Sequence, residues 1–463
     1  MKKKNLFRTL SFVLTFALLI TSCSSDDDNN DPIQQVDPTI TQIAIDTPLL
    51  SNLVSALQTA GLADTLNGNG PFTVFAPTDL AFENFLIANG FNDLSEVPTD
   101  VLTQILLNHV ISGELASGSL TTSYGNTLAT KQGTGENLSI YIDTTNGVRL
   151  NGVSNVSQAD IMASNGIIHI VDAVIGLPTI VDHAVANSNF SSLVGALTTD
   201  GNTTFTDLLS SAGDFTVFAP NNNAFSAFTN PNGNELNSIL ANHVIVGATA
   251  VSTSLSNTYV NSAATFNNSM DTYLSMYINT DDGVKINGTS NVIAADVIAT
   301  NGVIHVVDKV IDLPTIVDFA LADPTFDTLV TALTRDDLTF DYVTTLSTAN
   351  GTDPAPFTVF APTNTAFGDL LTELGASGLG DIAEPTLKAT LDYHAVAAAN
   401  VQSGALTDNM IVSTLGGDIT INVTGGPTAT DANNRVSNII VFDVQASNGV
   451  IHAIDKVILP PLQ

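Results

Sequence analysis

The sequence contains no tryptophan, a single cysteine and only 12 lysine and arginine residues among 463. One cysteine cannot form an internal disulfide, so packing and hydrogen bonds must hold the fold together. The 45 aspartates and glutamates give a formal net charge of −33, which should repel nucleic acid and anionic lipid. The acidity favours solubility outside the cell. The alternative is divalent cation binding, although no acidic loop has the spacing of a known calcium loop.

Motifs of known catalytic chemistry are missing as well. The chain has no Gly-X-Ser-X-Gly, no glycine-rich phosphate loop and no His-Glu-X-X-His. Aromatic residues make up only 6% of the chain, which counts against platforms for stacking sugars. We therefore expect a protein that is not an enzyme and that carries no cofactor and no metal.

The N-terminus has the features of an export signal. Lys2, Lys3, Lys4 and Arg8 precede an uncharged apolar run of 11 residues, 10–20, which is too short to span a bilayer. The run leads into Leu-Ile-Thr-Ser-Cys, which resembles a bacterial lipobox, and the cysteine is Cys23. We predict a lipoprotein signal peptide over residues 1–22 and lipidation of Cys23. The alternative is an ordinary signal peptide with an incidental cysteine.

Residues 23–37 begin with an acidic, polar stretch that cannot bury an apolar core, which predicts a disordered tether. Its position is similar to that of the export tag in surface lipoproteins of Bacteroidetes-type bacteria. This favours a lipid anchor in the outer membrane with the protein exposed at the cell surface. A plain spacer and a periplasm-facing protein remain the alternatives.

Two patterns recur three times in the same order. The first is Thr-Val-Phe-Ala-Pro, at residues 73–77, 216–220 and 358–362. The second is Asn-Gly-X-Ile-His-X-X-Asp-X-Val-Ile, at residues 165–175, 301–311 and 448–458. We predict three tandem domains over residues 38–177, 178–313 and 314–463. No Gly/Ser linker separates them, which favours semi-rigid junctions.

Each repeat reads as helices followed by strands. Apolar residues at helical spacing open it, and the first pattern is a strand that is apolar on both faces and that a proline ends. Good helix caps follow directly, at Thr78, Asn221 and Thr363. A helix ending in histidine and a set of strands joined by sharp turns complete the repeat. The fold class is therefore α+β with a mostly antiparallel sheet.

The two patterns resemble the conserved boxes of the fasciclin domain family. This resemblance covers residues 38–461 and implies a wedge-shaped, β-sandwich-like core flanked by helices, with a role in extracellular adhesion and no catalytic activity. The family's Tyr-His motif is complete only at Tyr393 and His394, because the first two repeats have asparagine before the histidine. Any adhesive role of that motif therefore falls on Tyr393 and His394.

Recurrent histidines and aspartates are the remaining candidates for chemistry. We interpret the histidines as buried and hydrogen-bonded, with a metal or general-base role as the alternative. The aspartates fit turns and caps, with acid–base work on a glycosidic bond as the alternative. The residues assigned to structural motifs are His109, His243, His169, His305, His452, Asp172, Asp308 and Asp455.

Taken together, the sequence predicts a surface-anchored adhesion protein that binds an extracellular matrix polymer, a surface protein or a glycan. Three weak contacts would act together if all three domains can engage at once. Two alternatives stay open. One is a carbohydrate-binding or carbohydrate-processing accessory protein of the cell surface, and the other is a structural spacer in the envelope.

Overall fold

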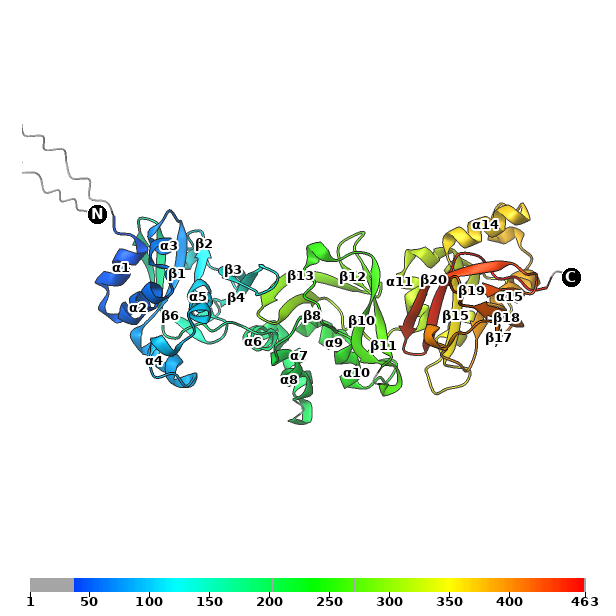
Figure 1. The fold of residues 1–463 in the computed structure, drawn as a ribbon, viewed down its shortest axis with the longest axis horizontal. Coiled ribbons are helices and arrows are strands. Elements are labelled where there is room, and N and C mark those ends of the chain that lie inside the picture. The colour runs from blue at the N-terminus through cyan, green and yellow to red at the C-terminus, as the bar shows by residue number, and fades with distance from the viewer. Residues whose placement is uncertain (1–36, 202, 270, 462–463) are drawn as a thin grey trace, which may run out of the picture. The chain divides into compact units, whose positions relative to one another are not determined.

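The computed structural model describes residues 37–201, 203–269 and 271–461. These residues form three domains in which the same elements follow one another (Figure 1). The predicted signal peptide and Cys23 lie outside the described residues, as does the predicted tether up to residue 36. Among the helices that the structure describes, none combines the length and the apolar character needed to cross a bilayer.

Among the described residues, each domain has five α-helices and seven strands, with short 3-10 helices between them. The first domain contains α1 (Ile40–Asp46), α2 (Ser51–Thr59), α3 (Ala63–Asn67), β1 (Phe72–Pro77), α4 (Asp79–Ala88), α5 (Thr99–Leu107), β2 (Val110–Ser112), β3 (Ser123–Thr130), β4 (Asn137–Asp143), β5 (Arg149–Leu150), β6 (Ser154–Ala163) and β7 (Gly166–Val171). The second contains α6 (Ile180–Ala186), α7 (Ser191–Leu197), α8 (Thr204–Ser210), β8 (Phe215–Pro220), α9 (Asn222–Ala227), α10 (Leu236–Ala241), β9 (Val244–Val246), β10 (Thr258–Thr265), β11 (Tyr273–Asn279), β12 (Lys285–Ile286), β13 (Ser290–Ala299) and β14 (Gly302–Val307). The third contains α11 (Ile316–Ala322), α12 (Asp327–Leu333), α13 (Tyr342–Leu346), β15 (Phe357–Pro362), α14 (Asn364–Leu374), α15 (Glu384–Asp392), β16 (Ala395–Val396), β17 (Met410–Ser413), β18 (Asp418–Asn422), β19 (Thr428–Thr430), β20 (Val436–Ala446) and β21 (Gly449–Ile454).

The seven strands of each domain are joined in one continuous order. In the first domain this order is β1 to β7, and a β1–β7 pairing closes the sheet into a barrel. All strand pairs within the sheet are antiparallel except this one, which runs parallel in every domain. The sheet is thus mostly antiparallel, as predicted, around a parallel pair that joins the two signature patterns.

The first pattern supplies the central strand and the start of the next helix. Every residue of β1 after Phe72 is buried, because the strand is covered on both faces. The Thr73 hydroxyl donates to the Gly113 carbonyl and accepts from the Leu115 N–H, at 2.7 and 2.9 Å. Thr78 then caps α4 by accepting from the Ala81 N–H. Asn221 and Thr363 cap α9 and α14 in the same way, so the predicted caps are confirmed.

The second pattern ties the helices to the sheet. The Asn165 side chain accepts from the Ile40 N–H, the first residue of α1, and donates to the carbonyls of Leu66 and Gly68. Asn301 and Asn448 make the corresponding three bonds in the other domains. One amide side chain therefore holds the first helix, the end of the third helix and the start of the histidine strand together.

Each sheet separates two apolar cores. Val74 and Ala76 face the helices and pack in the larger core, whereas Phe75 points to the other face, toward Ile140 and Leu150. Phe75, Phe218 and Phe360 hold the same place in the three domains, and each is at most 1% exposed. This second core gives the domain the sandwich-like interior that the family resemblance implies.

A glycine substitution tests the parallel pair. A Cβ at Gly302 would lie 2.1 Å from the Phe215 carbonyl oxygen in the backbone of the neighbouring strand. We expect Gly302→Ala to lower the free energy of unfolding by about 3 kcal/mol or more, because two paired strands must move apart. Gly195, on the exposed side of α7, meets nothing within 4 Å, so Gly195→Ala should be neutral or stabilise the helix by up to about 1 kcal/mol. Thermal unfolding that shifts equally in both variants would contradict this account.

Candidate functional site

The histidine after the mid-domain helix is a buried connector. His109 Nδ1 lies 2.7 Å from the Ile105 carbonyl oxygen, and its Nε2 accepts from the Ile175 N–H at 2.9 Å. The ring therefore carries its proton on Nδ1 and is neutral. His243 and His394 make the same two contacts, to Ile239 and Ile311 and to Thr390 and Ile458. Burial lowers the pKa of His109, His243 and His394 to about 4.

The histidine of the second pattern is engaged in a comparable way. His169 Nε2 donates to the Leu115 carbonyl at 2.9 Å, and Nδ1 accepts from the Asp160 N–H at 3.2 Å. Its ring stacks on Phe75 with 5.6 Å between centroids. His305 and His452 have corresponding partners, and burial lowers their pKa values below the usual range. All six rings thus use both nitrogens within the fold.

The recurrent carboxylates are used in the same manner. Asp172 accepts from the backbone and the side-chain amide of Asn155, at 2.7 and 2.9 Å. Asp308 and Asp455 bind Asn291 and Asn438 with the same geometry. Asp160 has a φ of 62° and accepts from the backbone and hydroxyl of Ser117, and Asp296 and Asp443 repeat this arrangement. These bonds have a structural role, but they join segments that lie 17 or 40–44 residues apart in the chain and do not close local turns.

Among the described residues, the histidine and aspartate side chains of the signature patterns therefore bond to the fold itself and are not arranged as a catalytic or metal-binding site. No group of three or more metal-ligating side chains occurs in the described part of the chain. His183, which the sequence places on a helix, is fully buried, and its pKa is lowered to about 4 by burial. Its Nε2 lies 3.3 Å from the Ile298 carbonyl oxygen, whereas Nδ1 has no partner among the described residues.

The two side chains of the candidate interaction motif, Tyr393 and His394, are buried. Tyr393 is 6% exposed and His394 is 3% exposed. The Tyr393 ring lies so close beneath Gly416 and Gly417 that no side chain would fit there. The fold therefore offers neither Tyr393 nor His394 to a partner, and we place the binding surface elsewhere.

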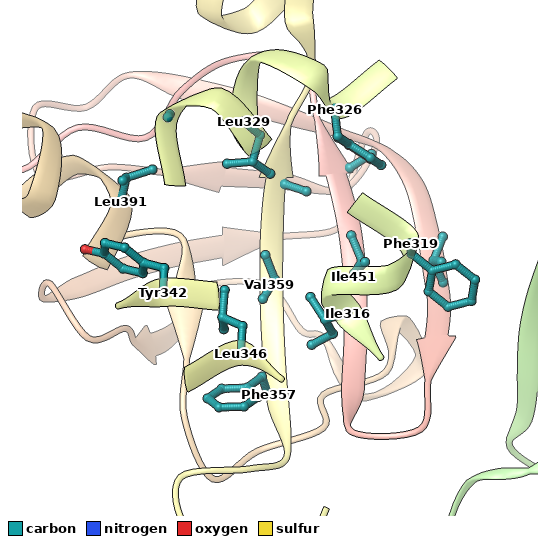
Figure 2. Close-up of a cluster of buried hydrophobic side chains, with 14 of the residues drawn as sticks. Ile316, Phe319, Phe326, Leu329, Tyr342, Leu346, Phe357, Val359, Leu391 and Ile451 are labelled. Carbon is teal, nitrogen blue, oxygen red and sulfur yellow. The ribbon is translucent and has the colours of Figure 1, made fainter. Parts of the chain in front are cut away.

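Two apolar cavities lie between the helices and the central strand. The cavity in the second domain measures about 80 Å³ and that in the third about 120 Å³. Figure 2 shows side chains around the second of these, including Ile316, Leu329 and Val359. Both are smaller than the roughly 150 Å³ of an engineered cavity that admits benzene. We regard them as parts of the core.

The junctions between domains follow one design. The Ile298 N–H donates to the Ser139 hydroxyl at 2.9 Å, which joins β13 of the second domain to β4 of the first. Gln445 and Ser275 form the same bond at the next junction, also at 2.9 Å. A glycine also lies close to the next domain at each junction: a Cβ on Gly152 would lie 3.2 Å from the Ala186 Cα, and one on Gly288 would lie 2.9 Å from the Ala322 Cα.

Each of these junctions also contains a pair of tyrosines from the preceding domain. Tyr124 and Tyr141 lie 5.0 Å apart, and Tyr124 meets the edge of the His183 ring of the next domain at 5.5 Å. Tyr259, Tyr277 and Phe319 repeat the arrangement at the second junction. Burial raises the pKa of Tyr124 and Tyr259 far above their usual range. At the first junction the buried Lys131 also forms an ion pair with Asp214 at 2.6 Å.

A cleft lined by both polar and apolar side chains lies beside the first junction. It measures about 620 Å³ and has walls from both the first and the second domain. Its lining includes Tyr124, Tyr141, Asn126, Asn189, Asn221, Ala294, Ala295 and Asp296. We call it the junction cleft. No local pattern in the sequence indicates the junction cleft, because its walls run from Thr122 to Val306 and so come from segments far apart in the chain.

Comparison with known proteins reveals a shared domain. The profile described as Fasciclin domain matches this chain over residues 48–178, 188–314 and 324–460. The transforming growth factor-beta-induced protein ig-h3 of Sus scrofa is 27% identical over 434 residues, which cover 93% of this chain. The match covers 59% of that protein, so this chain spans well under two thirds of its length.

Two microbial proteins are similar to parts of the chain. The uncharacterized protein sll1735 of Synechocystis is 38% identical over 147 residues, or 32% of this chain and 98% of that protein. The cell surface glycolipoprotein MPB83 of Mycobacterium bovis is 42% identical over 85 residues, or 17% of this chain and 36% of that protein.

The buried histidines predict a loss of stability as the pH falls from about 6.5 to 4. Unfolding releases rings whose ordinary pKa is about 6.5, so the unfolded chain binds more protons than the folded chain in this window. The folded values near 4 make this effect on the order of 3 kcal/mol for one fully shifted ring. Above pH 6.5 both states are neutral and this dependence vanishes.

Chemical denaturation at pH 7 and pH 5 checks this expectation. Replacing His243 by leucine should destabilise the second domain at pH 7, because two hydrogen bonds are lost, and should reduce the difference between the two pH values. Imidazole nitrogen NMR should show a neutral, Nδ1-protonated His243 at pH 5. A ring that titrates near pH 6.5 in the folded protein would refute the assignment.

The junction bonds predict a second outcome. Ser275→Ala removes only the hydroxyl and leaves the Gln445 N–H without its acceptor in a buried place, at a cost of about 1–3 kcal/mol. Amide hydrogen exchange should therefore become faster at Gln445. The Phe360 amide, which donates to the His394 carbonyl inside the third domain, should stay protected and serves as the internal reference. Unchanged exchange at Gln445 would mean that the serine does not hold the junction.

Proposed function

Because this chain belongs to the fasciclin domain family, we propose that it is a non-catalytic adhesion protein of the cell surface, anchored by lipid on Cys23. The observation that carries this proposal is the threefold use of one module whose recurrent polar residues all serve the fold. Two histidines and two aspartates recur in each of the three domains, and these are the groups best suited to catalysis. In every domain their side chains make hydrogen bonds within the fold. Repetition of such a module supports binding rather than turnover.

Repetition also has a direct physical effect on binding. When several weakly binding domains are joined in one chain, the second contact forms at a high effective concentration. The junction bonds support this reading, because docked neighbours lose less conformational freedom when they bind together than loosely linked ones would. The partner we propose is an extracellular matrix polymer, a surface protein or a glycan.

The membrane anchor rests on the sequence. The apolar run ends at the single cysteine of the chain, and two or three acyl chains on one residue suffice for stable anchoring. The similarity to a mycobacterial protein named cell surface glycolipoprotein supports the same location. We propose that the protein sits in the outer membrane and faces the outside of the cell, through the acidic tether of residues 23–37.

Replacing Cys23 by alanine tests anchor and function together. We expect the Cys23→Ala chain to leave the membrane fraction, and cells that express it to lose retention on matrix-coated surfaces. The measurement is the number of cells retained under flow, with protease treatment of intact cells to report exposure. A chain that lacks residues 314–463 but keeps Cys23 is the matched control, and it should weaken retention without releasing the protein. Cells that adhere equally with no chain at all would refute the function.

A further inference from the structure

We propose that the junction cleft binds a neutral oligosaccharide. This inference rests on the adhesion function above and names the class of partner that one of its surfaces recognises. The cleft has the size and place expected of such a site. Ligand pockets usually measure about 300–1,000 Å³ and are frequent at boundaries between domains. At about 620 Å³ the junction cleft lies within this range.

Three amide side chains of the cleft have hydrogen-bonding groups that the fold does not use. The side chains of Asn126 and Asn189 make no hydrogen bond within the described part of the chain, although both line the cleft. Asn221 uses its Oδ1 to cap α9, which leaves its Nδ2 for another partner. The three come from β3, from the turn Ser188–Phe190 and from the start of α9. Amides donate and accept at once, as sugar hydroxyls require.

An aromatic pair forms another part of the lining. Tyr124 is partly exposed in the cleft wall, whereas Tyr141 is only 3% exposed and packs against the Tyr124 ring with the two planes tilted by 51°. Aromatic rings offer apolar surface that can pack against the C–H face of a sugar. The junction contacts also hold Tyr124 in place, because its ring packs against His183 and its hydroxyl accepts from Asn187. A site that is ordered before binding loses less entropy when the ligand arrives. Across the cleft, Ala294 and Ala295 are small and exposed, which leaves room for a ring.

Charge decides between neutral and acidic sugars. No lysine or arginine lines the cleft, and its one ionisable carboxylate, Asp296, is held by Ser252. The whole chain carries a formal charge of −33. Uronates and sulfated sugars would therefore find repulsion and no counter-charge. A neutral glycan meets neither obstacle.

The second junction provides an internal comparison. Thr325 and Thr363 stand there in place of Asn189 and Asn221, so two of the three amides are missing. The strand bulge that carries Ala294 and Ala295 carries Val441 and Phe442 instead. Only Asn261, the counterpart of Asn126, keeps its amide. The structure thus assigns the site to the first junction specifically.

Binding of defined tetrasaccharides to the full chain tests this assignment. The protein is held in a detergent without a sugar headgroup, and ligand-observed NMR is recorded with cellotetraose, xylotetraose, mannotetraose and tetragalacturonate. We expect at least one neutral tetrasaccharide to bind and the acidic one not to bind. Asn126→Ala with Asn189→Ala should weaken that binding about tenfold, because two side-chain hydrogen bonds are lost. Neither side chain supports the fold, so this variant should melt like the wild type.

Asn261→Ala is the matched control and should leave binding unchanged. The inference falls if no neutral tetrasaccharide binds, if tetragalacturonate binds equally well, or if Asn261→Ala has the same effect as the double variant. Cells that adhere while no tetrasaccharide binds would overturn this inference and leave the adhesion function intact. Glycan binding at the cleft without adhesion of cells would refute the adhesion function and leave the cleft assignment standing.

Discussion

Each domain depends on the parallel pairing of the two strands that carry the signature patterns. Phe72 to Pro77 pair with Gly166 to Val171 across 94 residues of chain, and the other domains repeat the register. Helices cover one face of this pair and the second core covers the other. Asn165 binds the helices to one end of the pair, and Thr78 starts the next helix at the other. The order of elements follows from this pair.

The histidines show how a fold can use a titratable side chain as a structural link between two elements. In a neutral ring, one nitrogen donates and the other accepts, so a single residue links a carbonyl on one element to an N–H on another. His109 joins α5 to the segment after β7, and His169 joins β7 to the loop after β2. Burial lowers the pKa of His109 and keeps its ring neutral at ordinary pH, which preserves both of its bonds. The same residues would be poor metal ligands, because no lone pair is left free.

Much of the domain could be predicted from the sequence because its signals are local. Caps at Thr78, Asn221 and Thr363, the proline that ends the strand and the fold class all follow from neighbouring residues. The parallel register could not be predicted, because it joins segments that are far apart in the chain. The candidate site was even harder to predict from the sequence than the parallel register. Nothing around Tyr393 indicates that two glycines 23 and 24 residues later will cover it, and the amides of the junction cleft belong to two different domains.

The tyrosine pair has a consequence for the arrangement of the modules. At the positions of Tyr124 and Tyr141, the third domain pairs Ile411 with Thr420, and Ile411 is 66% exposed. A longer loop replaces the glycine turn that receives the following helix. The third domain therefore lacks the tyrosine pair that the first and second domains place at their junctions. The three domains share one fold, yet they are not interchangeable, and a chain with its domains in another order would lose the junction contacts that join β13 to β4 and β20 to β11.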